Sequence, residues 1–491
     1  MPRSPNVDPR PQLLTYPDSL GGSLGAIAEL LDGPLSGLFR GVHVLPPFPS
    51  SADRGFAPVT YTDIDPRFGS WDDLERISRR HDVLLDLMIN HISRRSPQFQ
   101  DFARLGRRSA HADLFITLDK VWADGTPGAG DVARIFLRKP DSPFSTVTIA
   151  ETGEQEQIWT SFGNSEWSEQ IDLDVTSDAT RSLIAGWLRS FAARGVRIVR
   201  LDAVGYVIKK PGTTCFMVEP EIYDFLGWVT GVAASLDLVV LPEVHDAYAT
   251  HERLAAHGFW TYDFVLPGLL LHTFATGQPE RLTNHLARSP DRQFTTLDCH
   301  DGIPVRPDLD GLLDPDEMVL LGQRVLARGG NVNRILSEAH VNGVDIHQLN
   351  VTYYSSLDCD DDKYVAARAI QLFTRGVPQV YYVGLFAGEN DDAAVVGSGD
   401  GRAINRHDYG IDEIQAALHR PVVQRVMDLV RLRNTHPAFD GVLSVDRLPG
   451  SSIGMRWTRG SESLGLEVDF ISGRAAIRDA GDAKEIASWR P

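Results

Sequence analysis

Eight short runs of apolar and β-branched residues constrain the fold of this chain more than any other feature of its sequence. Helical patterns separate these runs, for example at 71–80, 179–194, 221–235 and 364–374. Strands that alternate with helices predict parallel βαβ units, and about eight of them fit a (β/α)8 TIM barrel better than an open sheet. The expected strands are Gln12–Tyr16, Val42–Leu45, Val83–Ile89, Val196–Leu201, Leu238–Leu241, Phe259–Phe264, Phe294–Leu297 and Gln379–Val383.

Two long stretches interrupt this alternation. From about His91 to Thr176 the sequence is irregular and rich in turns, and from about Gly302 to Asp362 it is acidic and loop-like. Loops of this length inside a compact domain are usually functional insertions. Apolar alternation in Ser452–Trp457 and Gly465–Phe470 predicts a small β-sheet after the barrel. We therefore expect a barrel over 1–90, 176–301 and 363–440, insertions over 91–175 and 302–362, and a β domain over 441–491.

The charge balance excludes some classes of partner. The 491 residues include 48 Lys and Arg against 66 Asp and Glu, a formal net charge of −18, which disfavours binding to nucleic acid or to anionic membranes. The sequence has no apolar run long enough to span a bilayer, and residues 1–16 lack a signal-peptide pattern. Three scattered cysteines without metal spacing fit a reducing compartment. We expect a cytoplasmic protein, monomeric or homodimeric, without nucleic-acid or membrane partners.

Polar and charged residues follow four of the expected strands where each strand ends. Because the carboxyl ends of barrel strands meet at one face, where barrel enzymes place their sites, we expect these side chains to gather. They are Asp86 with Asn90 and His91, Arg200 with Asp202, Glu243 with His245, and Asp298 with His300 and Asp301.

Two of these carboxylates suit the cleavage of a glycosidic bond. Arg200 and Asp202 are two residues apart on a strand, so they share a face, and the arginine would keep Asp202 ionised as a nucleophile. Apolar walls and a nearby carboxylate would raise the pKa of Glu243 toward that of a general acid. Asp301 could stabilise positive charge at the anomeric carbon. Each residue alone also fits a structural role, since an Arg-x-Asp pair is most often a salt bridge.

These four motifs, in this order, resemble those of the α-amylase superfamily, glycoside hydrolase family 13. The resemblance covers nearly the whole chain, including an inserted B domain after the third strand and a C-terminal β domain. The chain resembles the sucrose phosphorylase subfamily more closely still. The segments that carry that similarity are Leu45–Pro58, Gly69–Asp73, Arg200–Tyr206, Gly212–Met217, Gly376–Gly384, Gly401-Arg402 and Asn405-Arg406.

The resemblance implies a retaining phosphorolysis by a glycosyltransferase-type enzyme. Asp202 would form a β-glucosyl-enzyme intermediate, Glu243 would act as acid and then base, and Asp301 would stabilise the transition state. Inorganic phosphate would take the glucosyl group as a co-substrate, with no metal and no other cofactor; the acidic stretch Asp308–Glu317 fails the EF-hand spacing and predicts a solvated loop. The residues implied to hold the glucosyl ring are Asp53, Phe56, His91, Arg200, His300 and Arg402.

Two positions distinguish the acceptor side of this chain. Arg138 stands where sucrose phosphorylases carry a Pro, and His347 stands where they carry a Tyr. Arginine binds phosphate through paired charge-assisted bonds, and a histidine beside phosphate favours its protonated form. Both changes resemble phosphorylases that act on sucrose 6'-phosphate and release fructose 6-phosphate. Other expected acceptor or phosphate residues are Lys139, Tyr206, His245, Asp345 and Gln348, with Lys209 and Lys210 as weaker candidates.

Several alternatives stay open at this point. Arg138 could be a solvated loop residue, and free sucrose, glucosylglycerol or glucosylglycerate could be the substrate, the last because its carboxylate could also use Arg138. A glucosidase or transglucosidase would use the same acids. A non-catalytic amylase-like transporter subunit is a remote alternative, since such subunits lose the catalytic acids that this chain keeps.

Overall fold

The computed structural model describes residues 5–163, 168–336, 343–479 and 484–489, and it divides into two compact units. The main segment of the first unit is Val44–Val244. The second unit combines Val7–His43, His245–Arg334 and Gly343–Pro491. Each unit holds strands of the main sheet.

The main sheet has eight strands in the order β10-β11-β15-β1-β2-β3-β8-β9. This order is a cyclic permutation of the order along the chain, with the last strand, β15, paired in parallel with the first, β1. Such an order is that of a (β/α)8 barrel, so the predicted fold class is confirmed. The strands are β1 (Gln12–Thr15), β2 (Gly41–Val44), β3 (Asp82–Met88), β8 (Val196–Asp202), β9 (Val239–Pro242), β10 (Thr261–Asp263), β11 (Gln293–Thr295) and β15 (Val377–Tyr381).

Two helices of the first unit, α2 (Trp71–Ser78) and α6 (Asp178–Ala193), begin at side-chain caps and pack through apolar faces. In α2, Ser70 and Asp73 form a capping box, and Ser177 caps α6. The buried face of α6 includes Phe191, whose ring stacks on that of Phe48 with 5.6 Å between centroids. The other α-helices of this unit are α3 (Pro97–Leu105), α4 (Leu118–Val121), α5 (Ala129–Val132) and α7 (Glu221–Ala234).

The first insertion has a core of its own. Strands β4 (His91–Ser93) and β7 (Gln170–Asp172) pair antiparallel, as do β5 (Phe144–Thr148) and β6 (Gln155–Trp159). Phe99, Phe102 and Phe115 are buried together beneath these strands. The insertion can therefore hold side chains in fixed positions, which a bare loop could not do.

The second insertion is more regular than the sequence suggested. It contains a three-stranded sheet, β12 (Ile303–Pro304), β14 (Ile346–Asn350) and β13 (Asn331–Arg334), and the helix α11 (Pro315–Leu326). The expectation of a loop-like stretch is wrong because Asp314 and Glu317 form a capping box that starts α11. Asp308, expected in a solvated acidic loop, is fully buried.

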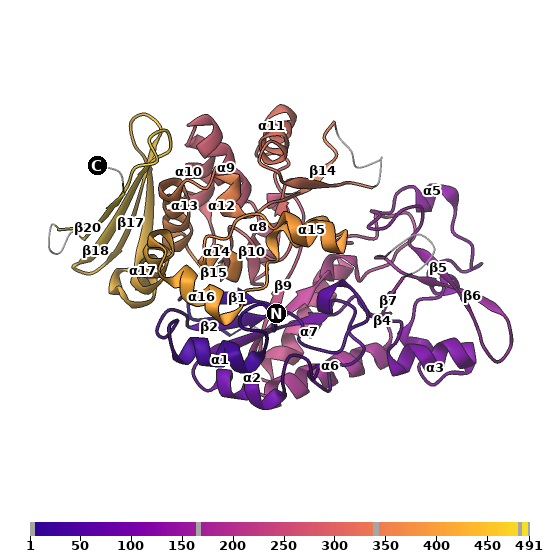
Figure 1. Cartoon of the computed structure of the whole chain (residues 1–491). Coiled ribbons are helices and arrows are strands. Elements are labelled where there is room, and N and C mark those ends of the chain that lie inside the picture. The colour runs from indigo at the N-terminus through magenta and orange to yellow at the C-terminus, as the bar shows by residue number, and fades with distance from the viewer. Residues whose placement is uncertain (1–4, 164–167, 337–342, 480–483, 490–491) are drawn as a thin grey trace. The chain divides into compact units, whose positions relative to one another are not determined.

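The C-terminal part forms the expected antiparallel sheet, drawn in yellow in Figure 1. Its strands are β16 (Val442–Arg447), β17 (Ser452–Arg459), β18 (Glu462–Asp469), β19 (Ala475–Asp479) and β20 (Lys484–Trp489). The remaining helices belong to the second unit: α1 (Leu24–Asp32), α8 (Tyr248–Ala256), α9 (Leu266–Thr276), α10 (Glu280–Arg288), α12 (Tyr353–Ser356), α13 (Asp361–Phe373), α14 (Tyr382–Leu385), α15 (Asp392–Ser398), α16 (Ile411–Leu418) and α17 (Pro421–Thr435).

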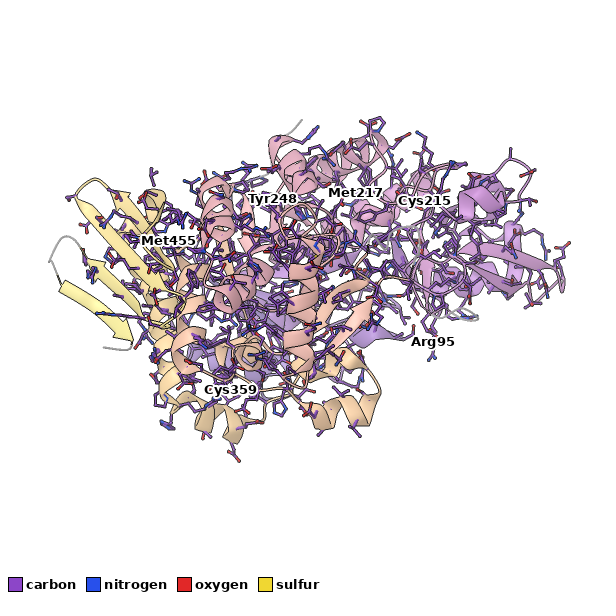
Figure 2. All side chains as sticks on the ribbon, turned by 90° about the horizontal axis from the view of Figure 1, so that it is seen from above. Arg95, Cys215, Met217, Tyr248, Cys359 and Met455 are labelled. Carbon is purple, nitrogen blue, oxygen red and sulfur yellow. The ribbon has the colours of Figure 1, made fainter. Side chains whose placement is uncertain are left out.

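Two global properties follow from the described residues. None of the helices in them has the length and apolar composition that a membrane span requires. All three cysteines lie in the described part of the chain and none is in a disulfide; Cys215 and Cys359 are labelled in Figure 2.

Candidate active site

In the first unit, parallel register brings two catalytic candidates to the same sheet edge. β3 and β8 pair with Asp86 opposite Arg200 and Met88 opposite Asp202. β8 and β9 also pair in parallel, and the Glu243 amide donates to the Leu201 carbonyl oxygen at 3.1 Å. Asp202 and Glu243 therefore stand at the carboxyl ends of adjacent strands.

One guanidinium group contacts three carboxylates there. Arg200 donates through Nη1 to Asp86 and, at 3.2 Å, to Asp202 Oδ1, while its Nη2 lies 2.9 Å from Glu243 Oε1. Glu243 Oε2 also accepts from the Ala203 amide at 2.9 Å. These contacts favour the ionised forms of both carboxylates. The expected surroundings of Glu243 were apolar walls and a nearby carboxylate, and the contact with Arg200 was not among them.

The glucosyl-site candidates of this unit lie around His91. The His91 ring is buried, and its Nε2 lies 2.9 Å from the Phe56 carbonyl oxygen. Burial lowers the pKa of His91, against an opposing pull from Asp172 and a smaller one from Asp53, so the ring is neutral at neutral pH. Asp53 and Phe56 lie two residues before and one residue after Gly55, whose φ of +113° and approach to Pro46 exclude a side chain.

Phe162, which no pattern in the sequence marks, joins residues that are expected at two subsites. Its ring centroid is 5.4 Å from that of His91 and 5.2 Å from that of Tyr206. The Arg138 guanidinium lies 5.9 Å from the same centroid. The structure therefore brings Arg138 and Tyr206 together, half-buried, on one aromatic side chain.

The neighbouring lysines have other partners. Lys139 is fully buried and donates to Phe144 O, Ser145 Oγ and Thr160 Oγ1 at 2.9, 3.2 and 2.7 Å. Burial lowers its pKa to about 8. The expectation that Lys139 serves an anion site is therefore corrected, because its ammonium group is used inside the insertion. Lys209 is ion-paired with Asp172, and Lys210 pairs with Glu221 at the surface.

In the second unit, Asp301 lies beside two arginines and a histidine. Arg402 Nη1 lies 3.3 Å and Arg406 Nη2 lies 3.7 Å from its Oδ1, and His300 Nε2 lies 3.4 Å from its Oδ2. Arg406 Nε also donates to the His300 carbonyl oxygen at 2.7 Å. Arg406 thus supports both residues, although we had noted it only as part of a motif.

The same segment offers the one group of metal-ligating side chains found among the described residues. Ligand atoms of Cys299, His300 and Asp301 lie within 4.8 Å of one another. The guanidinium groups of Arg402 and Arg406 already place positive charge beside Asp301, which disfavours a further cation.

Two acceptor-side histidines in the second unit are held through Nδ1. His245 Nδ1 lies 3.2 Å from Asp308 Oδ1, and its ring stacks on Phe264 with 4.1 Å between centroids. His347 Nδ1 donates to the Arg306 carbonyl oxygen at 2.6 Å. The two imidazole rings are 6.4 Å apart, so the structure brings these candidates together. Any bond that either ring makes to a ligand has to use Nε2.

The other two acceptor candidates are placed differently. Asp345 is 41% exposed and forms an ion pair with Arg334. Gln348 is buried on β14 and accepts from Asn333 at 3.5 Å. Because successive residues of a strand point to opposite faces, Gln348 and His347 cannot face one ligand through the same side of β14.

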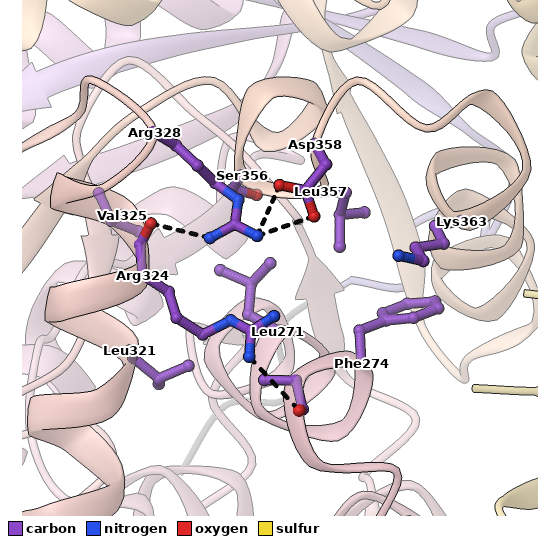
Figure 3. Close-up of a pocket in the computed structure, with 11 residues that line it drawn as sticks. Leu271, Phe274, Leu321, Arg324, Val325, Arg328, Ser356, Leu357, Asp358 and Lys363 are labelled. Atoms are coloured by element: carbon purple, nitrogen blue, oxygen red, sulfur yellow. Dashed lines mark hydrogen bonds and ion pairs between the residues drawn. The ribbon is translucent and has the colours of Figure 1, made fainter. Parts of the chain in front are cut away.

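A pocket of the second unit, shown in Figure 3, has none of the candidate residues in its lining. Leu271, Phe274 and Leu321 provide apolar surface there. Its arginines bind protein atoms: Arg328 bonds to Asp358 Oδ2 at 2.7 Å, and Arg324 reaches the Ala275 carbonyl at 3.4 Å. Because these arginines are bonded within the protein, we do not regard this pocket as an alternative acceptor site.

Comparisons with known proteins agree with this geometry. Residues 21–265 match the family model described as "Alpha amylase, catalytic domain". The chain is 50% identical to a sucrose 6(F)-phosphate phosphorylase of Thermoanaerobacterium thermosaccharolyticum over 95% of this chain and 96% of that one. It is 40% identical to a glucosylglycerol phosphorylase of Marinobacter adhaerens, over 94% of each chain.

A solved structure is similar over its whole length. The crystal structure of sucrose 6F-phosphate phosphorylase from Thermoanaerobacter thermosaccharolyticum superposes with a TM-score of 0.96, at 48% identity and with 99% of each chain covered. Such identity across both chains, with the barrel order and the strand-end acids in place, shows that this chain belongs to the α-amylase family and is a glucoside phosphorylase.

Proposed function

We propose that this enzyme converts sucrose 6'-phosphate and inorganic phosphate into α-D-glucose 1-phosphate and D-fructose 6-phosphate. Asp202 attacks the anomeric carbon, the bond to the fructosyl oxygen breaks, and Glu243 gives that oxygen a proton. Phosphate then attacks the β-glucosyl ester, passes its proton to Glu243 and releases Asp202. Asp301 stabilises the positive charge that develops at the sugar in both steps.

The observation that carries the choice of substrate is the cationic side chain beside Tyr206. Arg138 lies over the Phe162 ring, which also contacts Tyr206 and His91, so its charge is held next to residues proposed for both subsites. In a chain of net charge −18, a half-buried arginine at this place suits an anionic acceptor. The 50% identity to a sucrose 6(F)-phosphate phosphorylase supports the same substrate.

The remaining roles follow from this reaction. Asp53, Phe56, His91, Arg200, His300 and Arg402 hold the glucosyl ring, and Arg138, Tyr206, His245 and His347 face the leaving group or phosphate. The reaction uses no metal or organic cofactor, since two carboxylates and phosphate supply all of its proton and glucosyl transfers. We place the enzyme in the cytoplasm, where sugar phosphates are available, as a monomer or homodimer.

The test compares sucrose 6'-phosphate with free sucrose in phosphate buffer, following glucose 1-phosphate. We expect kcat/KM to favour the phosphorylated substrate by at least about a hundredfold, the effect of charge-assisted bonds to its phosphoryl group. Equal or better use of free sucrose would refute the substrate assignment while leaving the phosphorylase reaction in place.

Glucosylglycerol is the second candidate, because a relative 40% identical over 94% of the chain is a glucosylglycerol phosphorylase. The enzyme would belong to this second class if it released glucose 1-phosphate from glucosylglycerol or glucosylglycerate and consumed neither sucrose nor sucrose 6'-phosphate. Release of glucose alone, whatever the phosphate concentration, would indicate a hydrolase.

A further inference from the structure

Lys209 is a buried lysine with an ammonium group surrounded by oxygen atoms. Its side chain is 3% exposed, and Nζ lies 2.7 Å from Asp172 Oδ2. The ammonium also donates to Ser161 Oγ at 3.0 Å, to Asn90 Oδ1 at 3.2 Å and to the Tyr206 carbonyl oxygen. A buried ammonium group with this many contacts fixes the segments that supply them.

The partners of Lys209 come from separate segments of the first unit. Asn90 follows β3, Ser161 follows β6, Asp172 ends β7, and Tyr206 ends the short 3-10 helix after β8. One ammonium group therefore fastens the first insertion to the ends of two barrel strands.

These same segments carry three aromatic rings of the proposed site. Asn90 precedes His91 and Ser161 precedes Phe162 in the sequence, and Tyr206 is itself the third. The Phe162 ring contacts both of the others, with centroid distances of 5.4 and 5.2 Å. Lys209 thus holds the chain beside each member of a continuous wall, which we call the three-ring wall: His91, Phe162 and Tyr206.

Lys209 also balances the charge beneath this wall. Asp172 is fully buried, and the ammonium of Lys209 helps to lower the pKa of its carboxyl group, with further hydrogen bonds from Ser161. Asp172 raises the pKa of His91 whereas Lys209 lowers it. Without Lys209, the carboxylate of Asp172 would be left with less compensation in the interior, which is strongly destabilising.

We propose that Lys209 is a positioning residue that keeps the three-ring wall assembled, and that the wall keeps water from the glucosyl-enzyme ester. It acts through His91, Phe162 and Tyr206 and does not touch the substrate. The proposal rests on the proposed function, because the wall has a role only if those rings line the site.

Hydrolysis of the glucosyl-enzyme ester competes with phosphorolysis, and the ratio of the two products measures it. Water that reaches the ester attacks the anomeric carbon, gives a proton to Glu243 and frees Asp202, so glucose forms in place of glucose 1-phosphate. Loosening the wall should raise the ratio of glucose to glucose 1-phosphate and the KM for phosphate more than it lowers kcat.

Four variants separate positioning from charge compensation. Lys209→Met removes the ammonium group, and Lys209→Met with Asp172→Asn removes both charges, so the double variant does not leave a bare carboxylate buried. Ser161→Ala keeps the ion pair and removes the hydroxyl group that bonds to Lys209, to Asp172 and to the Trp159 indole. Lys210→Met is the matched control, because Lys210 belongs to the same loop but is exposed and pairs with Glu221.

Thermal melts and product ratios, with the best donor of the wild type, decide the outcome. We expect Lys209→Met to melt at a lower temperature and the double variant to recover stability while its glucose ratio stays raised about tenfold or more. Ser161→Ala should shift the ratio in the same direction by less, and Lys210→Met should match the wild type. The proposal is overturned if the double variant regains both the stability and the product ratio of the wild type. It is also overturned if the product ratio is unshifted in both Ser161→Ala and the double variant. A wild type that makes only glucose would instead refute the proposed function.

Discussion

Removing the charge of Arg138 and the Nε2 group of His347 should abolish the preference for a phosphorylated acceptor. Arg138→Met keeps an apolar stem over Phe162, where the guanidinium now lies 5.9 Å from the ring centroid. His347→Asn can still donate to the Arg306 carbonyl oxygen, which His347 Nδ1 reaches at 2.6 Å. Both substitutions thus remove a proposed phosphate contact with little change in packing.

The expected magnitude follows from the number of charged contacts. A hydrogen bond to a charged group contributes about 1.5–3 kcal/mol. One or two such bonds from Arg138 are therefore worth about 1.5–6 kcal/mol, which is about 10- to 25,000-fold in kcat/KM. His347 adds a further bond, and since both groups would hold one phosphoryl group their effects need not add. We expect the double variant to lose at least about a hundredfold on sucrose 6'-phosphate, which is the size of the expected preference, and less than about threefold on sucrose.

The assay is kcat/KM for both substrates at saturating phosphate, with Arg108→Met as control. Arg108 is an exposed arginine of the same insertion, bonded to Glu151 at 2.9 Å, so its loss tests the effect of net charge alone. An equal fall on both substrates would place Arg138 and His347 in folding or in the glucosyl site and refute the reasoning. So would an Arg108→Met enzyme with the same loss of preference.

Three further predictions concern single residues. Glu243→Gln should lower kcat on natural donors by about a thousandfold or more, because the amide cannot transfer a proton, with an unchanged thermal melt; near wild-type turnover would contradict its role. Phe162→Ala should raise KM for both sucrose substrates about tenfold or more, since His91, Arg138 and Tyr206 share its ring; an effect on one substrate alone would limit Phe162 to the acceptor side. Because burial lowers the pKa of Lys139 to about 8, the unfolded chain holds more protons than the folded one between that pH and the ordinary lysine pKa, and stability should rise with pH across that window. Urea unfolding measures this as a rise in the free energy of unfolding of up to about 3 kcal/mol across the window, relative to a Lys139→Met variant. If the free energies of unfolding of the wild type and the variant changed in parallel with pH, the ammonium group would not be desolvated.

Sequence periodicity predicted the barrel because its strands are short, apolar and separated by amphipathic helices. The strand-end residues could be identified for the same reason: a charge directly after a buried strand, as at Asp202 and Glu243, is costly unless it has a function. The contact of Arg200 with Glu243 could not be predicted, because it depends on the register of two neighbouring strands. For that reason the apolar surroundings that we expected for Glu243 were incomplete.

Residues of the insertions were harder to assign. Arg138 and Lys139 are adjacent basic residues, yet one lies over Phe162 and the other is buried among Phe144, Ser145 and Thr160. Nothing in their local sequence distinguishes them, because their surroundings come from residues distant along the chain. Phe162 was missed for a similar reason, since a single aromatic residue in an irregular stretch has no periodicity to mark it.

The Arg200 guanidinium, which contacts both Asp202 and Glu243, makes these two carboxylates share one counterion. In the proposed reaction Asp202 loses its negative charge when it becomes an ester. The ester then no longer repels the carboxylate of Glu243, while the Arg200 guanidinium still lies 2.9 Å from it. This favours the carboxylate form of Glu243 at the stage when it has to accept a proton from phosphate. The change of Glu243 from acid to base would thus be driven by the covalent state of its neighbour, without any movement of the backbone.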